Sequence, residues 1–409
     1  MNEPSQAPAV PSTHEQPTAN ALPVRFTGTG AEYFRIWIVN LLLTLVTLTL
    51  YLPFARARRI RYFQNHTLVG DDPLGFHADP WRMFRGYLVV LVLGIAYFVI
   101  TNFLPHLGWI AVVALMVAWP WLWRASLQFR LRNTSWRGVR FRFHGDLAPA
   151  YAVMAPLFLP ALALVIATAG MPSNPEEMSP DAAANFMVIF SATMLLTLLL
   201  GPWLFMRLKR YQHSGYGFTQ QRTHLSGGDG RFYVICIVTA LLTALIVAAF
   251  SVLMMIPAAL AAPIETEVLN YGTETATEGE PSISLLMVMF YGALTAGMYL
   301  LVASLAGSYF ASRTQNLLWN NTRSQKIQFR SALTWGDLLA VTAVNWLLIV
   351  LTLGLYWPWA RVRSARVRLN ALTVMADGDI AEWTADMPAS ERGALGDAAG
   401  DYMGFDIGL

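Results

Sequence analysis

The chain has 409 residues, of which 55% are hydrophobic and only 13% are charged, with a formal net charge of +3 and a mean hydropathy of +0.44. Soluble globular domains carry about a quarter charged residues, so this composition indicates an integral membrane protein. The single cysteine, Cys236, excludes an intrachain disulfide and a cysteine-based metal site. The arginines lie beside apolar spans, which fits lipid headgroups better than nucleic acid.

The N-terminal residues 1–23 are polar and proline-rich and lack the basic start of a secretory signal, so we expect them to be disordered. The first apolar segment, Phe34–Phe54, then leads into the phrase "TLTLYLPFARARRIR" (Thr47–Arg61). A tyrosine, a proline and an aromatic residue followed by arginines are typical of the boundary between an apolar helix and lipid headgroups. Pro53 is expected to end or kink the apolar helix.

Six further segments are apolar over about the 20 residues that a membrane-crossing helix needs. The connections after the second, fourth and sixth of them are rich in arginine, whereas the connections between the members of each pair contain no Lys or Arg. Because positive residues are retained on the cytoplasmic side, the basic connections are expected there. The six segments are Gly86–Leu104, Leu107–Trp123, Pro149–Gly170, Phe186–Phe205, Phe232–Ala262 and Ile283–Phe310.

Two of the cytoplasmic connections resemble each other: "HTLVGDDPLGFHAD" (His66–Asp79) and "NTSWRGVRFRFHGD" (Asn133–Asp146). The alternation in "GVRFRF" predicts a short strand, and "GDDP" predicts a turn, so short β-hairpins are possible in these loops. His77, Asp79, His144 and Asp146 are residue types that bind metals. Each aspartate, however, directly precedes an apolar helix, where a helix cap is expected. We therefore expect no metal and no cofactor.

The opening phrase returns 305 positions later as "TLGLYWPWARVRSAR" (Thr352–Arg366), at the end of the apolar segment Leu338–Trp359. From residue 40 to residue 65 the two copies align without a gap and share 13 of 26 residues, so we expect internal repeats within one transmembrane domain, residues 24–372. The remaining residues 373–409 are acidic and are expected to be disordered.

The two repeated segments raise a question of topology. A single crossing of Leu338–Trp359 would place Arg361, Arg363 and Arg366 outside, against the pattern of the other connections. We therefore favour re-entrant hairpins with both termini cytoplasmic, each arm of roughly ten residues reaching about 15 Å. The alternative is two further spans, which gives eight crossings.

Several residues of the repeated phrase are candidates for a lipid or interfacial role, either as anchors in the headgroup region or as a specific lipid or solute site. Asn40 and Asn345, at matching positions inside the apolar segments, either satisfy the backbone of a turn or hydrogen-bond between helices. The interfacial candidates are Arg56, Arg58, Arg61, Arg361, Arg363, Arg366, Tyr51, Tyr356 and Trp359.

The stretch "VRFTGTGAEYFRIWIVNLLLTLVTLTLYLPFARARRIRYF" and its echo "VNWLLIVLTLGLYWPWARVR" resemble the YjgN family of bacterial inner-membrane proteins, also called domain of unknown function 898. The resemblance covers about Val24 to Asn370. The first copy has Leu52 and Phe54 where the second has Trp357 and Trp359. The resemblance implies a multi-pass inner-membrane protein, and it implies no reaction, cofactor or catalytic residue.

The sequence contains no HExxH, GxSxG, P-loop or GxGxxG motif, so we expect that the protein is not an enzyme. Transporters are often built from repeats, and the first hypothesis is therefore transport or permeation of a solute. The alternative is a membrane-organising protein that interacts with anionic lipid through its arginine–aromatic segments. Membrane lipids are the expected partners, and neither nucleic acid nor metal is expected.

Overall fold

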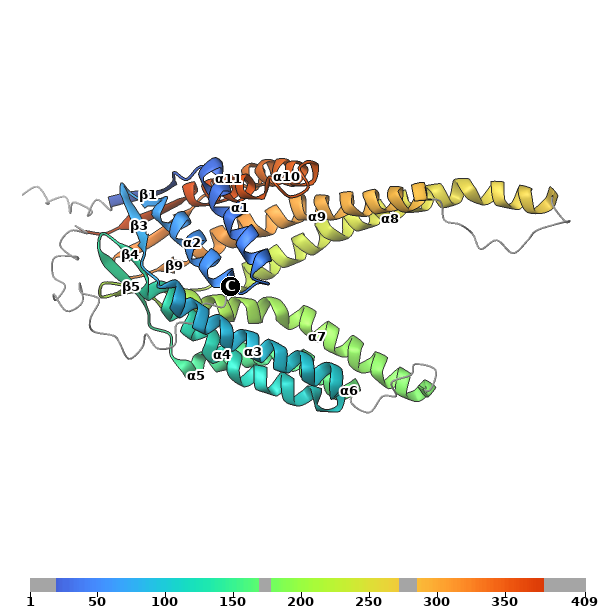
Figure 1. The fold of residues 1–409 in the computed structure, drawn as a ribbon, viewed down its shortest axis with the longest axis horizontal. Coiled ribbons are helices and arrows are strands. Elements are labelled where there is room, and N and C mark those ends of the chain that lie inside the picture. The colour runs from blue at the N-terminus through green and yellow to red at the C-terminus, as the bar shows by residue number, and fades with distance from the viewer. Residues whose placement is uncertain (1–19, 169–177, 272–284, 379–409) are drawn as a thin grey trace, which may run out of the picture.

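The computed structural model describes residues 20–168, 178–271 and 285–378. Within these residues one arrangement occurs five times: a strand, a helix that leads away, a helix that returns, and a second strand. Figure 1 shows the strands gathered at one end of the molecule and the long helices extending from that end. We number the five arrangements units 1 to 5.

Unit 1 consists of β1 (Asn20–Phe26), α1 (Gly30–Val46), α2 (Leu52–Asn65) and β2 (Thr67–Val69). Unit 2 consists of β3 (Asp72–Phe76), α3 (Pro80–Phe103), the 3-10 turn η1 (Pro105–Leu107), α4 (Gly108–Arg132) and β4 (Thr134–Trp136). Unit 3 consists of β5 (Val139–Phe143), α5 (Leu147–Met154), η2 (Ala155–Phe158), α6 (Leu159–Thr168), α7 (Pro180–His213) and β6 (Tyr216–Phe218). Unit 4 follows β7 (Gln221–Arg222) and consists of β8 (His224–Leu225), α8 (Asp229–Tyr271), α9 (Leu285–Asn320) and β9 (Thr322–Arg323). Unit 5 consists of β10 (Ile327–Ser331), α10 (Trp335–Leu351), α11 (Trp357–Asn370) and β11 (Leu372–Ala376).

In the described part of the chain, eleven strands form one antiparallel sheet in the order β7-β6-β5-β4-β3-β2-β1-β11-β10-β9-β8. The first and last strands are neighbours, with Asn20 opposite Ala376. The edge strands β7 and β8 are separated only by Thr223, so the chain itself completes a nearly closed ring. The expectation of an all-helical protein is therefore corrected. The hairpins β2–β3 and β4–β5 are confirmed, but they belong to one continuous sheet.

The ring has an apolar inner face and a polar outer face. Trp136, Val139 and Phe218 are buried in one cluster with residues of β10 and β11. In β5, Val139, Phe141 and Phe143 alternate with Arg140 and Arg142, and Arg142 is exposed. The alternation follows from the period of two in a strand, so one set of side chains lines the inside of the ring while the other faces outward.

The strands extend slightly beyond the expected domain boundaries of residues 24 and 372. β1 begins at Asn20 and β11 ends at Ala376 because these two strands pair with each other. The rest of the two terminal segments expected to be disordered, residues 1–19 and 379–409, lies outside the described residues.

Six helical stretches among the described residues are long and apolar enough to cross a membrane, and they coincide with the six expected segments. The returning helices are longer than expected. α4 continues to Arg132 instead of ending near Trp123, and α7 and α9 continue to the ring in the same way. Many of the arginines that follow the spans therefore lie on helical extensions and not in loops.

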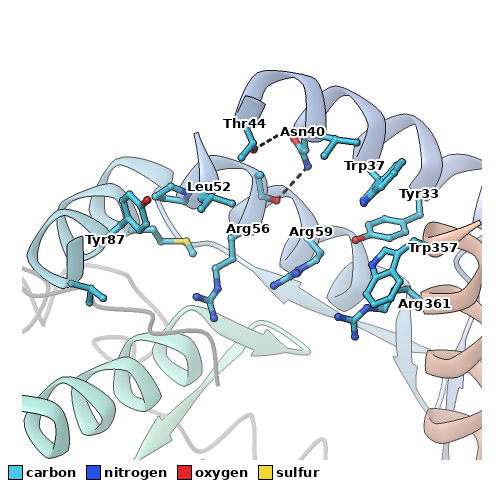
Figure 2. Close-up of a pocket in the computed structure, with 15 residues that line it drawn as sticks. Tyr33, Trp37, Asn40, Thr44, Leu52, Arg56, Arg59, Tyr87, Trp357 and Arg361 are labelled. Carbon is cyan, nitrogen blue, oxygen red and sulfur yellow. Dashed lines mark hydrogen bonds between the residues drawn. The ribbon is translucent and has the colours of Figure 1, made fainter. Parts of the chain in front are cut away.

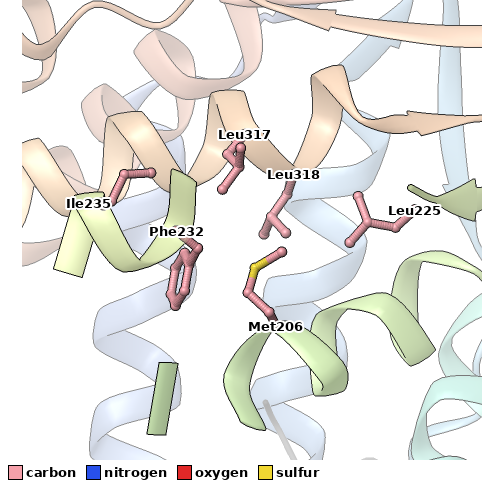
Figure 3. Close-up of a cluster of buried hydrophobic side chains, with 6 residues drawn as sticks. All are labelled: Met206, Leu225, Phe232, Ile235, Leu317 and Leu318. Atoms are coloured by element: carbon pink, nitrogen blue, oxygen red, sulfur yellow. The ribbon is translucent and has the colours of Figure 1, made fainter. Parts of the chain in front are cut away.

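A cluster of buried side chains joins units 3 and 4 where their helices leave the ring (Figure 3). Phe232 of α8 is only 1% exposed and stacks on Phe205 of α7, with ring centroids 4.9 Å apart. Met206 of α7 and Leu317 of α9 complete the contact. Removal of a buried phenylalanine from such a cluster typically costs about 3–5 kcal/mol.

The two terminal apolar segments form helical hairpins, but not with the arms expected from the sequence. In the first copy α1 contains the apolar segment up to Val46, the turn lies at residues 47–51, and the arginines lie on α2. Pro53 and Pro358 lie in the first turn of α2 and α11, so they begin the returning helices and do not end the apolar ones. Proline is tolerated there because the first turn needs no backbone N–H partner.

Candidate functional site

The two hairpin turns are built alike. Thr47 accepts a hydrogen bond on Oγ1 from the backbone N–H of Tyr51 at 3.0 Å, and Thr352 does the same for Tyr356 at 3.0 Å. Positive φ angles follow at Leu48 (48°) and Thr49 (74°), and at Leu353 (50°) and Gly354 (92°). The shared threonine, leucine and tyrosine of the repeated phrase therefore specify one turn geometry in both copies.

Asn40 and Asn345 join the two arms of their hairpins. The side-chain N–H of Asn40 donates to the carbonyl of Ala55 at 3.4 Å, and that of Asn345 donates to Ala360 at 3.2 Å and to Ser364 Oγ at 3.2 Å. Two roles were expected for these residues, and both asparagines take the second one, a hydrogen bond between helices. The side-chain oxygens of both asparagines are buried and have no hydrogen-bond partner in the described structure.

The hairpin tips are apolar and exposed. Leu48 is 83% exposed in the first copy and Leu353 is 94% exposed in the second. The neighbouring residues Val46 and Leu351 are also exposed. Large apolar side chains at a protruding tip are typical of contact with lipid.

Part of the arginine set connects one unit to the next around the ring. Arg61 of α2 donates to the carbonyl of Ala78 at 3.5 Å, just before α3. Its counterpart Arg366 of α11 donates to Gly28 at 2.8 Å, just before α1. The same step recurs at the other junctions, where the contacts are Arg124 to Gly145, Arg210 to Asp229, and Asn316 to Leu333.

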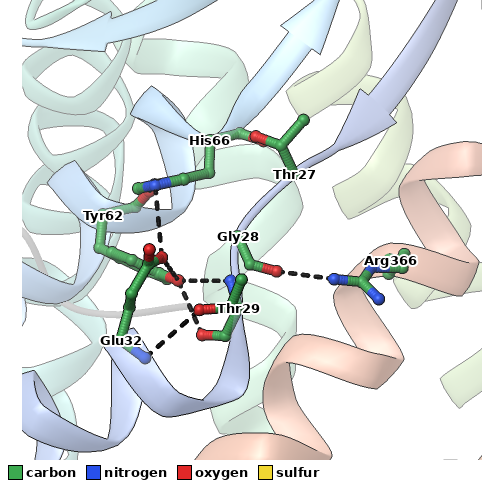
Figure 4. Close-up of polar contacts among 7 residues, drawn as sticks. All are labelled: Thr27, Gly28, Thr29, Glu32, Tyr62, His66 and Arg366. Atoms are coloured by element: carbon green, nitrogen blue, oxygen red, sulfur yellow. Dashed lines mark hydrogen bonds and ion pairs between the residues drawn. The ribbon is translucent and has the colours of Figure 1, made fainter.

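The junction before α1 contains further polar contacts (Figure 4). The Tyr62 hydroxyl accepts a hydrogen bond from the backbone N–H of Thr29 at 2.8 Å and lies 3.2 Å from Glu32 Oε2. His66 Nε2 lies 3.8 Å from the same carboxylate. These contacts fix the start of α1 against the end of α2.

The other interfacial candidates pair with aromatic rings. Arg58 lies over the ring of Tyr51 at 5.7 Å, and its counterpart Arg363 donates to the hydroxyl of Tyr356 at 3.1 Å. Trp359 stacks on Phe34 of α1, with centroids 4.8 Å apart. These residues therefore contact aromatic side chains within the hairpins and between them.

Three arginines from the two ends of the chain converge on one cavity. Arg56 and Arg59 of α2 and Arg361 of α11 line a cavity of about 490 Å³ between the first hairpin and α3. Figure 2 shows their guanidinium groups pointing toward the same open region. The remaining lining residues are Tyr33, Trp37, Asn40, Leu41, Thr44, Leu52, Pro53, Ala55, Met83, Tyr87, Val90 and Trp357.

The chemistry of this cavity favours an anion. Among its described lining residues there is no aspartate or glutamate. Arg361 lies over the ring of Trp357 at 5.1 Å, so an aromatic side chain helps to orient its guanidinium group. Arginine binds phosphate and carboxylate oxygens in pairs through its planar fork.

Arg59 was not among the residues expected at a site. The helical period could have identified Arg59 from the sequence, because residues three positions apart lie on one face of a helix. Arg56 and Arg59 share one face of α2 and line this cavity, whereas Arg58 and Arg61 share another and line a separate, open hollow with Arg35.

The histidines and aspartates of the loops do not gather. Among the described residues there is no group of three or more His, Cys, Asp or Glu side chains that could hold a metal ion. Asp79 caps α3 through a hydrogen bond from Trp81 at 3.0 Å, as expected, while Asp146 precedes α5 without a side-chain cap. Burial, followed by Arg140 and Arg61, lowers the pKa of His77, whose Nε2 lies 2.8 Å from Ser135 Oγ.

Comparison with known proteins identifies the family. A family model described as "Bacterial protein of unknown function (DUF898)" matches residues 21–402. The chain belongs to this family. It is 26% identical over 392 residues to the inner membrane protein YjgN of Salmonella typhimurium LT2, covering 90% of this chain and 92% of that protein. It is 23% identical over 352 residues to the YjgN of Escherichia coli O157:H7, covering 82% and 84%. No solved structure matches.

Membership in this family agrees with the six apolar helices, and this DUF898 protein is accordingly an inner-membrane protein with transmembrane helices. The match covers both terminal hairpins and nearly the whole ring, so the arginine cavity lies inside the matched region.

Proposed function

We propose that this DUF898 protein binds the phosphate of anionic lipids in the cavity lined by Arg56, Arg59 and Arg361, and that it thereby organises lipid in the cytoplasmic leaflet. The observation that carries the proposal is the convergence of these three arginines on one cavity of about 490 Å³ without a lining carboxylate. The proposal adopts the lipid alternative of the sequence analysis and contains no catalytic step.

The membrane position of the cavity is part of the proposal. α1 has 17 residues and is therefore about 25 Å long, less than the roughly 30 Å hydrocarbon core. β1 and β2 pair directly, and a single crossing between Phe26 and Thr67 would separate them. The hairpin therefore enters and leaves on one side, with its apolar tip in lipid. The cavity then lies near headgroup depth, between that tip and the ring.

The shape and lining of the cavity fit a lipid better than a free phosphate. Tyr33, Trp37 and Tyr87 supply aromatic surface of the kind found at membrane interfaces. Only 11% of the residues in the apolar stretch of the neighbouring helix α3 are buried inside the protein, so the surface of this helix is available to acyl chains. A phosphate held by the arginines would leave the chains of the lipid beside α3.

The test is lipid selectivity of the purified full-length protein in mixed phosphatidylglycerol and phosphatidylcholine bilayers, measured by native mass spectrometry of retained lipid. The wild-type protein should retain phosphatidylglycerol with roughly tenfold preference, because two or three charge-assisted hydrogen bonds are involved. The triple variant Arg56→Gln, Arg59→Gln, Arg361→Gln should lose this preference.

The matched control is Arg58→Gln, Arg363→Gln, Arg330→Gln, which removes the same charge from outside the cavity. Equal loss of selectivity in both triple variants would reduce the effect to general surface charge and contradict the proposal. Displacement of the lipid by inorganic phosphate at millimolar concentration would instead assign the site to a soluble anion.

The topology has its own test. With the ring on the cytoplasmic side, an alkaline phosphatase fused after Asp377 should be inactive and a green fluorescent protein at the same point should fluoresce. High phosphatase activity would place the end of β11 in the periplasm. It would also contradict the proposed depth of the cavity.

Transport of a solute is the second candidate function. Its specific support is the buried amide oxygen of Asn40 beside the arginines, which has no hydrogen-bond partner among the described residues and lies within a hairpin that we assign to the membrane. Flux of small organic anions into liposomes that contain the protein would favour transport, and the same triple variant should abolish it.

A further inference from the structure

The interior of the strand ring contains a second cavity, of about 370 Å³, separate from the arginine cavity. Strands from both ends of the chain line it, with Phe141 of β5, Phe329 of β10 and Val374 of β11 among the contributors. Volumes of about 300–1,000 Å³ are usual for pockets that bind small molecules, and most such pockets are largely apolar.

All five returning helices complete the lining where they join the ring, α4 with Leu127, Arg130 and Leu131 and the other four with one residue each. The last lining residue of each helix lies three or four positions before the following strand. Three of these five residues are apolar and two are glutamines. Four of them, in units 1, 2, 4 and 5, lie three positions before the first residue of the following strand, so the ring geometry selects the position. The five are Gln64, Leu131, Gln212, Trp319 and Leu369.

Two polar atoms among the lining residues have no hydrogen-bond partner within the part of the chain that the structure describes. Trp136 is only 6% exposed, and its indole N–H is buried without a hydrogen-bond acceptor. The side-chain oxygen of Gln64 is buried without a donor, while its N–H donates to Thr134 Oγ1 at 3.1 Å. Buried donors and acceptors are nearly always satisfied, since an unsatisfied one costs about 1–3 kcal/mol.

We propose that the ring cavity binds a small amphipathic molecule with an apolar chain and a neutral head that both donates and accepts hydrogen bonds, such as an alcohol or an amide. Its head accepts from the Trp136 indole and donates to Gln64, and its chain contacts Phe141, Phe329 and Val374. This site does not depend on the proposed lipid site, because the two cavities share no lining residue.

Photolabelling of the full-length protein in lipid nanodiscs tests the proposal. The probes are a diazirine-bearing octanol, the corresponding octane and the corresponding octanoate, and labelled residues are mapped by mass spectrometry. Octanol should label the strand residues that line the ring cavity about fivefold more than octane, because one net hydrogen bond contributes about that factor. Labelling of lipid-facing helices, which all probes reach, provides the internal reference.

Variants separate this site from partition into the bilayer. Val374→Trp fills the cavity and should abolish ring labelling, whereas Thr373→Trp, one position along the same strand and absent from the lining, should retain it. Trp136→Phe removes the N–H and keeps an aromatic, although smaller, side chain at this position. It should retain octane labelling and lower the octanol preference, because only the hydrogen bond to Gln64 remains.

Three results would overturn the proposal. They are ring labelling that survives Val374→Trp, an octanol preference unchanged in Trp136→Phe, and octanoate labelling stronger than octanol labelling. The last would mean that Arg130, the one charged side chain among the described lining residues, selects an acidic head. If Val374→Trp does not fold, the octanol to octane ratio in Trp136→Phe decides alone.

Discussion

The N-terminal hairpin, α1 with α2, and the C-terminal hairpin, α10 with α11, repeat one phrase and one geometry, yet their surroundings differ. Phe54 of the first packs against Trp81 and Phe84 of the long helix α3. Its counterpart Trp359 stacks on Phe34 of α1, which is itself a hairpin helix. The repeated phrase therefore determines the turn and the asparagine hydrogen bonds between the two arms. The side chains that each hairpin contacts depend on the next unit around the ring.

Arg361 reaches the arginine cavity because the two ends of the chain lie side by side. β1 and β11 pair, so α11 lies beside unit 1, and α11 supplies Trp357 and Arg361 to a cavity otherwise built by units 1 and 2. The proposed anion site thus requires both ends of the chain.

The largest difference between the hairpins is expected at glycines in the first turns of their outgoing helices, Gly30 in α1 and Gly336 in α10. A Cβ at Gly30 would overlap the ring of Trp359, whereas a Cβ at Gly336 would meet no atom of the described neighbouring residues within 4 Å. Gly30→Ala should destabilise the protein by about 1–3 kcal/mol through overpacking. Gly336→Ala should be neutral or stabilise it by about 0.5 kcal/mol. Thermal unfolding of both variants in detergent measures this, and equal melting temperatures would refute the packing difference.

The junction arginines come next. Arg366 donates to Gly28 at 2.8 Å, but Arg61 reaches Ala78 only at 3.5 Å. Arg366→Gln should therefore cost about 1.5–2 kcal/mol, and Arg61→Gln well under 1 kcal/mol, because a long hydrogen bond contributes little. Chemical unfolding of the two variants compares them. A larger effect at Arg61 would contradict the ranking.

A smaller difference is expected at the asparagines that join the hairpin arms. Asn345 makes two hydrogen bonds at 3.2 Å and Asn40 makes one at 3.4 Å. Asn345→Ala should lower stability by about 1–2 kcal/mol and Asn40→Ala by about half as much. Resistance to limited proteolysis within each hairpin provides the readout, and the order of the two variants is the decisive result.

The smallest effect concerns pH. His77 follows the first hairpin, whereas the C-terminal hairpin leads around the ring to Thr27 at the matching position. The pKa of His77 is lowered by burial and then by Arg140 and Arg61, so the unfolded chain takes up a proton that the folded chain resists. Stability from this group is complete above the ordinary histidine pKa and declines as the pH falls below it.

His77→Gln should flatten the decline in melting temperature between pH 7 and pH 5, because glutamine does not titrate. Thr27→His, the reciprocal change, tests whether the junction beside Arg366 acquires the same pH dependence. An unchanged slope in His77→Gln would show that other groups determine the acid sensitivity.

The sequence predicted those features that depend on local pattern. The six apolar segments, the strand in "GVRFRF" and the cap at Asp79 all follow from periodicities and residue preferences within a short stretch. The family resemblance rested on the repeated phrase and was correct. The position of the hairpin turn was missed because the arginine run was assigned to a border, although α2 is a helix of 14 residues that contains it.

The ring could not be predicted in the same way. Its strands are two to seven residues long among the described elements, and β1 pairs with β11, some 350 residues away. Strands such as Gln221–Arg222 carry no periodic signal, and their partners are fixed only by the arrangement of the helices. For the same reason the convergence of Arg56 and Arg59 with Arg361 depended on a contact between opposite ends of the chain.

The pairing of β1 with β11 also orders the biogenesis of the protein. At about 5–20 residues per second, the ribosome needs roughly 20–70 s to synthesise the chain between the two strands, and during that interval one edge of β1 has no partner. A chain that stops before Leu372 keeps this edge exposed, in the form that invites mispairing or capture by quality control. The first strand of the chain can therefore complete its pairing only after the last strand has been synthesised.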